Sequence, residues 1–276
     1  MKNKKKINRK PDTFSLISII ITLLVIVFIS SAIISVVAGG VAYLPEALTS
    51  RETWFSIKLS LKTATISTTL CVLTAIPVAY ALTRTEMPLK KLSEIIIELM
   101  MCLPYLVLGL CLLILFSSPF GDFLRDIGFK VVFTVNGIII AQYFVNLPFA
   151  IRMIRTAFMQ MDERLEVIAG MLGASKWKQM TTILLPLARN SIISMIILTW
   201  SRAIGEFGAT LMLVGITRMR TETLPGSIYL SISTGDTKRA MASATIMLVI
   251  SVAALIISNK LNEPPKYYRI GGEDGK

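Results

Sequence analysis

Long apolar stretches separated by short polar segments dominate the pattern of this chain. Each stretch is long enough to cross ~30 Å of hydrocarbon as an α-helix, which rises 1.5 Å per residue. A transmembrane β-barrel would show short segments of alternating polarity instead. The pattern therefore predicts an all-α integral membrane protein with about six transmembrane helices. The expected spans are residues 14–38, 57–82, 95–116, 131–151, 191–215 and 240–258.

Composition supports a membrane protein and argues against catalysis. The chain is 54% hydrophobic and only 17% charged, whereas soluble domains are about 45–50% apolar and about 25% charged. It contains no histidine, which removes the commonest general base and the commonest metal ligand. Its three cysteines lie in apolar segments without CxxC spacing, as buried small hydrophobes do. We expect no catalytic residue, no metal site and no cofactor.

The ends of the chain are polar, and they frame the apolar core. Residues 1–13 form a basic tail, and residues 14–38 are too long for the 7–15-residue core of a signal peptide. We therefore predict an uncleaved first transmembrane helix. The main transmembrane core is expected over residues 55–258, followed by a polar tail over residues 259–276.

The basic residues predict the orientation in the membrane. The net charge is +12, but the lysines and arginines cluster at the ends of apolar runs, where they anchor helices at an anionic membrane face. This placement favours a lipid bilayer over nucleic acid as the partner. If the N-terminus is cytoplasmic, nineteen of the 29 basic residues lie on the cytoplasmic side. The positive-inside rule then predicts that both termini are cytoplasmic and that the protein is a multi-pass protein of the cell membrane.

An amphipathic insert, "EVIAGMLGASKWKQMTTILLPLARNS", separates the fourth and fifth spans. We expect a short helix over residues 162–172, with Asp162 as N-cap and Gly173 as its left-handed end. A second helix should begin near Ser175 and be interrupted at Pro186. From the residues alone, the insert either lies in the lipid interface or inserts into a partner protein. Its apolar stripe consists of Leu165, Ile168, Ala169 and Leu172.

The fifth span carries two charges inside an otherwise apolar run. Arg202 and Glu206 are four residues apart, so on one helix they share a face and can pair. A charge at the bilayer centre costs at least ~2.5–3.5 kcal/mol, so such residues usually face the protein interior or a water-filled path. We expect either a span that lines the translocation path or a structural ion pair between helices. The candidate path or gate residues are Ser201, Arg202, Gly205, Glu206 and Gly208.

The insert resembles the cytoplasmic signature of ABC importer permeases, which runs from an acidic-Ala-Ala triplet through a glycine to I-x-L-P. Here Gly173 is followed at the same spacing by Ile183, Leu185 and Pro186, while Val167-Ile168-Ala169 stands at the triplet. The resemblance implies the type I ABC importer permease fold, with a coupling helix between helices 4 and 5 whose angle is set by the I-x-L-P residues. The residues that it assigns to ATPase coupling are Glu166, Ala169, Gly173, Ile183, Leu185 and Pro186.

The same resemblance implies partners. They are two copies of an ABC ATPase subunit, an extracytoplasmic substrate-binding protein and a second copy of this chain. The terminal "GGEDGK" cannot serve as a P-loop, because its spacing is short and no Ser or Thr follows. ATP hydrolysis is therefore expected in a separate subunit, and this chain is expected to perform no covalent chemistry.

Two further stretches narrow the substrate. "RAIGEFGATLMLVG" and "TETLPGSIYLSISTGD" resemble permeases for molybdate and tungstate, and sulfate permeases are a looser match. Arg218 and Arg220 either draw a divalent anion into the mouth of the path or face a docked binding protein. An ion-coupled transporter remains as an alternative, which co-purification with an ATPase would distinguish. An intramembrane enzyme is a third class, for which the chain offers only one deep acid, Glu206.

Overall fold

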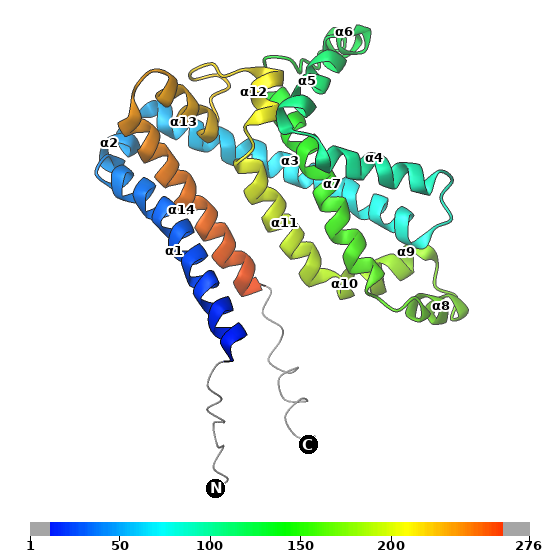
Figure 1. The fold of residues 1–276 in the computed structure, drawn as a ribbon. Helices are drawn as coiled ribbons and strands as arrows, with labels where there is room; N and C mark the ends of the chain where they lie inside the picture. The colour runs from blue at the N-terminus through cyan, green and yellow to red at the C-terminus, as the bar shows by residue number, and fades with distance from the viewer. Residues whose placement is uncertain (1–11, 262–276) are drawn as a thin grey trace.

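The structure is a computed structural model, and it describes residues 12–261. Of the predicted tails, residues 1–11 and 262–276 lie outside the described residues, whereas Thr13 already begins the first helix and residues 259–261 continue the last. Within them every regular element is a helix, as Figure 1 shows. The long helices are α1 (Thr13–Val41), α3 (Arg51–Arg84), α7 (Val135–Met159), α11 (Arg189–Ile204) and α14 (Thr237–Leu261).

Shorter helices complete the chain between the long ones. They are α2 (Leu44–Thr49), α4 (Lys90–Cys102), α5 (Tyr105–Phe116), α6 (Pro119–Asp126), α8 (Arg164–Met171), α9 (Lys176–Gln179), the π-helix η1 (Met180–Leu184), α10 (Leu185–Leu187), α12 (Gly208–Val214) and α13 (Leu224–Ser233).

The described residues contain four helices long and apolar enough to cross a membrane: α1, α3, α7 and α14. Two bent helix pairs raise this to six if each pair is one span. One pair is α4 with α5, bent by 116°, and the other is residues 176–187 with α11, bent by 73°. The predicted all-α membrane fold is therefore confirmed, with four to six candidate spans among the described residues against the six predicted.

The bend of the third span occurs at Pro104. Leu103 is extended, with φ −73° and ψ 139°, because the ring of a following proline disfavours the helical conformation. Pro77 and Pro148, in contrast, stay inside α3 and α7. Of the three prolines that the sequence places in spans two to four, only Pro104 separates two helices.

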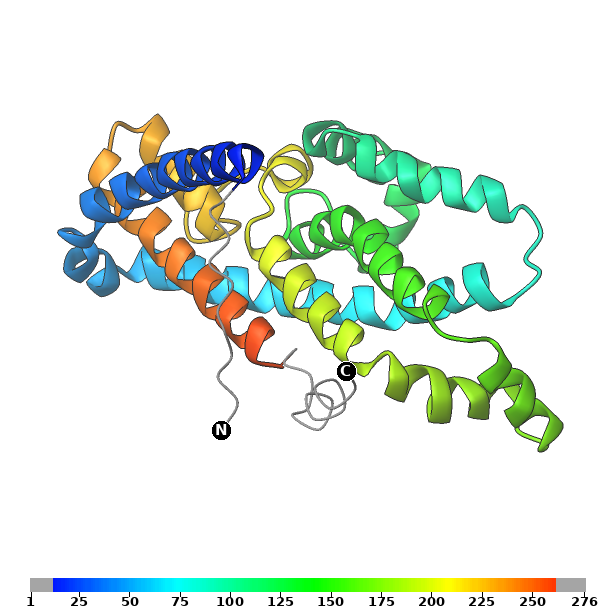
Figure 2. The same cartoon turned by 60° about the horizontal axis from the view of Figure 1, so that its bottom comes forward.

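The centre of the molecule is the crossing of α3, α7 and α11, which lie side by side in Figures 1 and 2. Small residues of α3, including Ala75 and Ala79, are fully buried there and let the helix backbones approach closely. Phe158 and Met195 fill the space between the helices and are likewise fully buried. This packing holds fixed the helices that carry the site described below.

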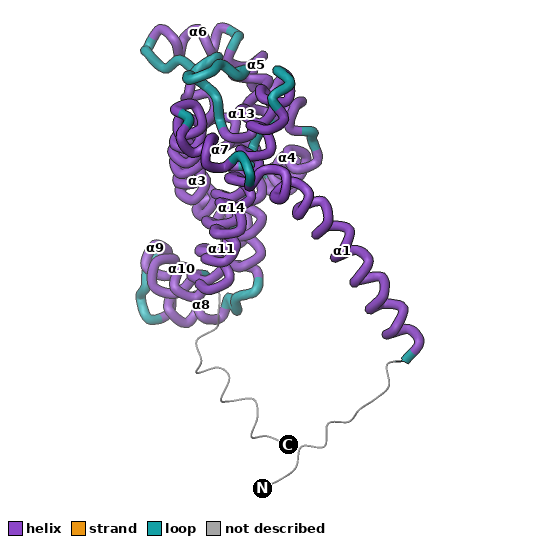
Figure 3. Tube along the Cα trace, turned by 90° about the vertical axis from the view of Figure 1, so that its left-hand side faces the viewer, coloured by secondary structure: helices purple, strands orange, loops and turns teal. Residues whose placement is uncertain are grey.

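Helix α1 packs on α14 and diverges from the remaining helices, as Figure 3 shows. The contact is close near its end, where a Cβ on Gly40 would collide with Thr245 and with the Met241 backbone. Most of its other side chains are exposed. The start of α1 and the end of α14 lie at the same end of the molecule as α10 (Figure 1).

Three helices form in segments that the sequence pattern left as loops: α2, α6 and α13. Each has a proline in its first two positions, where the missing N–H costs nothing. The most consequential is α13, because most of its first half is buried and the Leu224 N–H donates to Ser60 Oγ of α3 at 2.8 Å. These helices are too short to produce a periodic apolar pattern.

Candidate functional site

The fifth predicted span is broken where its charges lie. Helix α11 ends at Ile204, and α12 begins at Gly208. The buried Glu206 carboxylate accepts hydrogen bonds from the backbone of Ala209 at 2.8 Å and of Thr210 at 3.2 Å, and from the Thr210 hydroxyl. Glu206 therefore caps the first turn of α12, because the free N–H groups at a helix start attract a carboxylate.

Arg202 points to a different set of partners. Its Nε donates to Asn146 Oδ1 of α7 at 3.3 Å, and its Nη2 donates to the Tyr105 hydroxyl of α5 at 2.9 Å. Its guanidinium carbon lies 4.7 Å from the centre of the Phe149 ring. The predicted Arg202–Glu206 pair is therefore wrong. The helix break between the two residues removes the shared face, and Glu206 bonds to α12 instead.

This arrangement leaves a positioned positive charge within a membrane span. No described carboxylate lies within ion-pair distance of Arg202, and the residue is exposed. Its partners are an amide, a phenol and an aromatic ring, which orient the guanidinium without neutralising it. The outer N–H groups of the fork remain available for a bidentate contact with an anion. Arg202 thus has the geometry of an anion-binding group.

The other predicted path residues surround this guanidinium only in part. Gly208 permits close approach of α12 to α5, since a Cβ there would lie 3.1 Å from Tyr105 Cβ. Gly205 is exposed at the end of α11, and Ser201 is half-buried. The expected common face of these residues is interrupted by the helix break. Tyr105, Asn146 and Phe149 come from two other helices, and the sequence pattern gave no signal for them.

The amphipathic insert folds as α8, which ends before Gly173, and then as the consecutive helical elements α9, η1 and α10. Asp162 Oδ1 accepts from the N–H of Arg164, the first residue of α8, at 2.9 Å, but Glu163 and not the predicted Asp162 occupies the N-cap position. Gly173 is left-handed, with φ +84°, and the Ala174 N–H donates to the Ala169 carbonyl at 2.9 Å. This is the Schellman end of a helix, which favours glycine. The predicted first helix and its glycine stop are both present.

Arg84, the last residue of α3, ties the insert to the transmembrane helices. Its Nε lies 2.7 Å from Glu166 and its Nη1 lies 2.9 Å from Glu163. Its Nη2 donates to the carbonyls of Phe158 at 2.8 Å and Met161 at 3.1 Å. The Arg84 and Glu166 side chains are each 7% exposed. Glu166 therefore faces inward. Arg84 is a site residue that the sequence pattern did not indicate, because it lies 82 residues before Glu166.

The outward side of the insert is apolar. Leu172, Met171 and Trp177 are 83%, 76% and 71% exposed, and this segment projects from the molecule in Figure 2. At the far end, Ile183 and Leu185 are half-buried, and the exposed Pro186 lies at the 73° bend into α11. The insert thus offers a large apolar surface on a base that Arg84 fixes.

At the opposite end of the molecule a charged cluster joins α3, α14 and the loop before α13. Glu52 forms ion pairs with Arg239 and, at 3.8 Å, with Arg218. Glu222 is buried beside them and accepts from the Met219 N–H at 3.2 Å. Burial raises the pKa of Glu222, against the opposing effects of that hydrogen bond and of Arg239. Arg218 therefore pairs within the chain although its side chain is exposed, and Arg220 is exposed as well.

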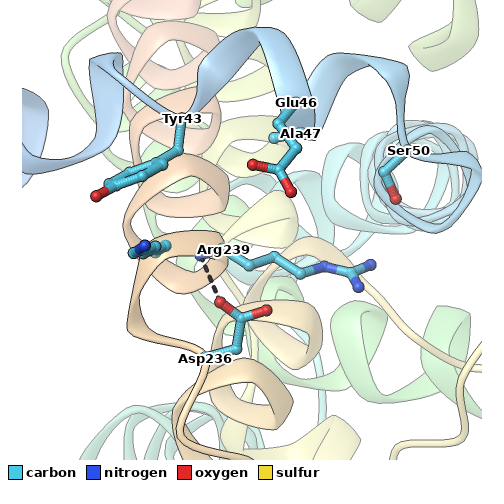
Figure 4. Close-up of a pocket in the computed structure, with 7 residues that line it drawn as sticks. Tyr43, Glu46, Ala47, Ser50, Asp236 and Arg239 are labelled. Atoms are coloured by element: carbon cyan, nitrogen blue, oxygen red, sulfur yellow. Dashed lines mark hydrogen bonds between the residues drawn. The ribbon is translucent and has the colours of Figure 1, made fainter.

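A small cavity lies beside this cluster, between α2 and the start of α14 (Figure 4). Its volume is about 190 Å³, and acidic and basic residues both line it. Lys238 lies over the Tyr43 ring at 5.3 Å from the ring centre. The mixed charge gives the cavity no preference for ligands of one sign. The charged residues of its lining are Glu46, Asp236, Lys238 and Arg239.

The chain is similar in sequence to a family of membrane transport components. Residues 72–264 match the family described as binding-protein-dependent transport system inner membrane component. The chain is 37% identical over 157 residues to the molybdate/tungstate transport system permease protein WtpB of Thermococcus kodakarensis, covering 57% of this chain and 59% of that one.

Two further relatives cover more of the chain. The molybdenum transport system permease protein ModB of Mycobacterium tuberculosis is 34% identical over 76% of this chain and 79% of its own. The probable sulfate transport system permease protein cysT of Anthoceros angustus is 32% identical over 79% and 74%.

The fold also matches a solved structure. A bacterial alginate ABC transporter, solved in complex with its pentasaccharide-bound periplasmic protein, superposes with a TM-score of 0.71. The match covers 93% of this chain and 95% of that chain at 17% sequence identity. At this identity the likeness concerns the fold alone.

Proposed function

Because the chain belongs to the family of binding-protein-dependent transport system inner membrane components, we propose that it is the permease subunit of an ATP-driven importer for molybdate or tungstate. The permease spans the membrane and performs no covalent chemistry. A separate ABC ATPase hydrolyses ATP, and an extracytoplasmic binding protein delivers the oxyanion. One copy supplies one wall of the path, so the working unit contains two copies of this chain and two ATPases.

The observation that carries the proposal is the unneutralised guanidinium of Arg202. A charge within a membrane span is costly unless it faces protein or water, and Arg202 is exposed on this chain. Its orientation by Tyr105 and Asn146 leaves donors for a doubly charged tetrahedral anion. We place Arg202 on the wall of the translocation path, with Ser201, Gly205 and Gly208 beside it and with Glu206 holding the turn that follows.

The proposal includes an orientation. Both termini lie on the cytoplasmic side, together with the amphipathic insert from α8 to α10, which is called the coupling segment from here on. The Glu52 cluster faces the binding protein. Residues 1–13 and 259–276 are cytoplasmic tails, residues 14–38 are the first span, and residues 55–258 are the permease core. The start of α1, the end of α14 and α10 lie at one end of the molecule, as this orientation requires.

In the proposed cycle, ATP-driven closure of the two ATPases moves the coupling helices. Residues Glu166, Ala169 and Gly173 hold the shape of that helix, and its exposed apolar side enters the ATPase. Ile183, Leu185 and Pro186 set the angle at which the motion passes into α11 and so to Arg202. The path then changes from inward-open to outward-open, and hydrolysis returns it.

Sulfate is the second candidate substrate. It is also a tetrahedral dianion, and the Anthoceros angustus sulfate permease is 32% identical to this chain, against 34% for the mycobacterial molybdenum permease. A guanidinium recognises charge and geometry that these ions share. Selection between them therefore rests on the binding protein in this proposal.

The test is uptake into vesicles that contain the permease, its ATPase and its binding protein. We expect ATP-dependent accumulation of radiolabelled molybdate, and a fall of at least tenfold in the Arg202→Gln variant, since a charge-assisted contact contributes ~1.5–3 kcal/mol. Arg125→Gln, which removes an exposed arginine of α6 that pairs with Asp122, is the matched control and should keep most of the uptake. Accumulation by the permease alone, without ATPase or nucleotide, would refute the proposal.

A further inference from the structure

A cavity of about 490 Å³ lies between α7 and α11, on the coupling-segment side of Arg202. It is separate from the Arg202 cluster, but Phe149 belongs to both: its ring lies under the Arg202 guanidinium and also lines the cavity. The cavity and the Arg202 cluster therefore share one residue, Phe149. Its polar lining residues are Arg152, Thr156, Gln160, Ser191 and Ser194.

Polar side chains of both helices line this space together with the apolar residues Met101, Phe149, Met153 and Ala157. On α7, Phe149, Arg152, Thr156 and Gln160 recur at intervals of three and four residues and all line the cavity. Side chains at such spacing lie on one face of a helix. Ser191 and Ser194 precede Arg202 by eleven and eight residues, or about three and two turns, on α11. A charged side chain such as Arg152 between membrane helices usually faces the protein interior or water.

The charge of this lining is positive. Arg152 is exposed and makes no ion pair with a described residue, whereas Arg155, one turn further, lies 2.7 Å from Glu94. Glu98 lines a neighbouring cavity together with Arg152, but it is not within ion-pair distance of it. One of the two α7 arginines is thus neutralised within the chain, and the other is left to face the cavity.

We propose that this cavity is a second oxyanion-binding subsite, with Arg152 as its anion-contacting residue. The inference rests on the importer function proposed above. Arg152 lies six residues from Asn146, the partner of Arg202, which corresponds to about 9 Å along α7. An anion released by Arg202 therefore meets a second guanidinium on its way out, beside the hydroxyl group of Ser191. Two successive weak sites let an ion leave more easily than one strong site.

The test uses the permease–ATPase complex in lipid nanodiscs without nucleotide, with radiolabelled molybdate as the probe. Arg152→Gln should weaken equilibrium binding about tenfold, the loss expected for one charge-assisted contact. Arg152→Lys should restore most of it, because it keeps the charge. The matched control is the double variant Glu94→Gln/Arg155→Gln, which removes a neighbouring ion pair without changing the net charge and should bind molybdate as the unmodified complex does.

The outcomes separate the subsite from the importer function. Unchanged molybdate binding and uptake in Arg152→Gln, together with loss in Arg202→Gln, would overturn the subsite and leave the importer intact. A lipid phosphate carries the same tetrahedral oxygens, so bound phospholipid is measured by native mass spectrometry. If Arg152→Gln sheds phospholipid but keeps its molybdate affinity, the subsite belongs to lipid and the proposal is wrong. If the unmodified complex takes up neither molybdate, tungstate nor sulfate, the importer function itself fails.

Discussion

At the scale of single residues, two charges that the sequence places four apart perform unrelated tasks. Glu206 accepts hydrogen bonds from the backbone of α12, and Arg202 is oriented by neutral groups from α5 and α7. The spacing indicated a pair only because it assumed a continuous helix. A carboxylate can instead cap the helix that follows, which leaves Arg202 without a carboxylate partner among the described residues.

This separation predicts weak energetic coupling between the two residues. Arg202→Gln and Glu206→Gln should change the thermal stability of the purified permease additively, to within about 0.5 kcal/mol in a double-mutant cycle. An ion pair inside a membrane span would couple more strongly, since removing one partner would leave the other charge unpaired. A coupling energy above ~1 kcal/mol would therefore restore the ion pair and contradict the geometry.

Glu222 predicts a pH dependence of stability. Burial raises its pKa in the folded protein above the ordinary value of 4.5, so the folded state holds the proton more tightly than the unfolded state. The resulting stabilisation is complete below pH 4.5 and is lost as the pH rises through the raised pKa. The melting temperature of Glu222→Gln minus that of the unmodified protein should therefore increase as the pH rises from 4 to 8.

The matched control for this pH series is Glu46→Gln, which neutralises an exposed glutamate at the same end of the molecule. Its melting-temperature difference from the unmodified protein should stay nearly constant across the series. If the melting-temperature difference between Glu222→Gln and the unmodified protein is also constant with pH, the folded protein does not favour the protonated Glu222 carboxyl.

At the scale of elements, the coupling segment is a helix on a fixed base. Arg84 joins the end of α3 to Glu163, Glu166 and two carbonyls of the α7–α8 connection. Four directed contacts from one guanidinium make this junction stiff, because the planar fork has few alternative geometries. We expect the segment to move together with α3 and not to swing on a loose loop.

Arg84→Gln should loosen this junction. It leaves the buried Glu166 carboxylate without its cation, a change that costs about 3–5 kcal/mol for a buried pair. In vesicles we expect ATP hydrolysis to persist while the oxyanion transported per ATP falls several-fold. Arg84→Lys should rescue it only in part, because an ammonium cannot reproduce the four contacts. Arg125→Gln, which breaks the exposed Asp122 pair, is the control and should shift stability by less than ~0.5 kcal/mol.

At the scale of the whole molecule, the hydropathy pattern located the membrane segments but not their shape. Apolar length alone identifies a span, and the glycine at residue 173 and the proline at residue 186 mark real ends and bends. Whether an internal proline bends a helix depends on its neighbours, so Pro104 and Pro148 could not be distinguished beforehand. Short helices such as α13 give no periodic signal.

The candidate site was predicted less completely than the fold. The sequence identified Arg202 because a charge in an apolar run is conspicuous. It did not identify Tyr105 or Asn146, which are ordinary residues until the fold places them beside that charge. Arg84 and Glu166 are 82 residues apart, and no local pattern relates them. Contacts between distant segments are set by packing, which a single sequence does not display.

Helix α3 has a consequence for how the two faces of the membrane communicate. It is a single rod of 34 residues, about 50 Å long. Glu52, near its first residue, holds Arg218 and Arg239, while Arg84 at its last holds the coupling segment. A tilt of this rod displaces both ion clusters at once. In the proposed importer, docking of a loaded binding protein outside and ATP-driven movement inside would therefore each displace the opposite end of α3, without any chain of small side-chain rearrangements between them.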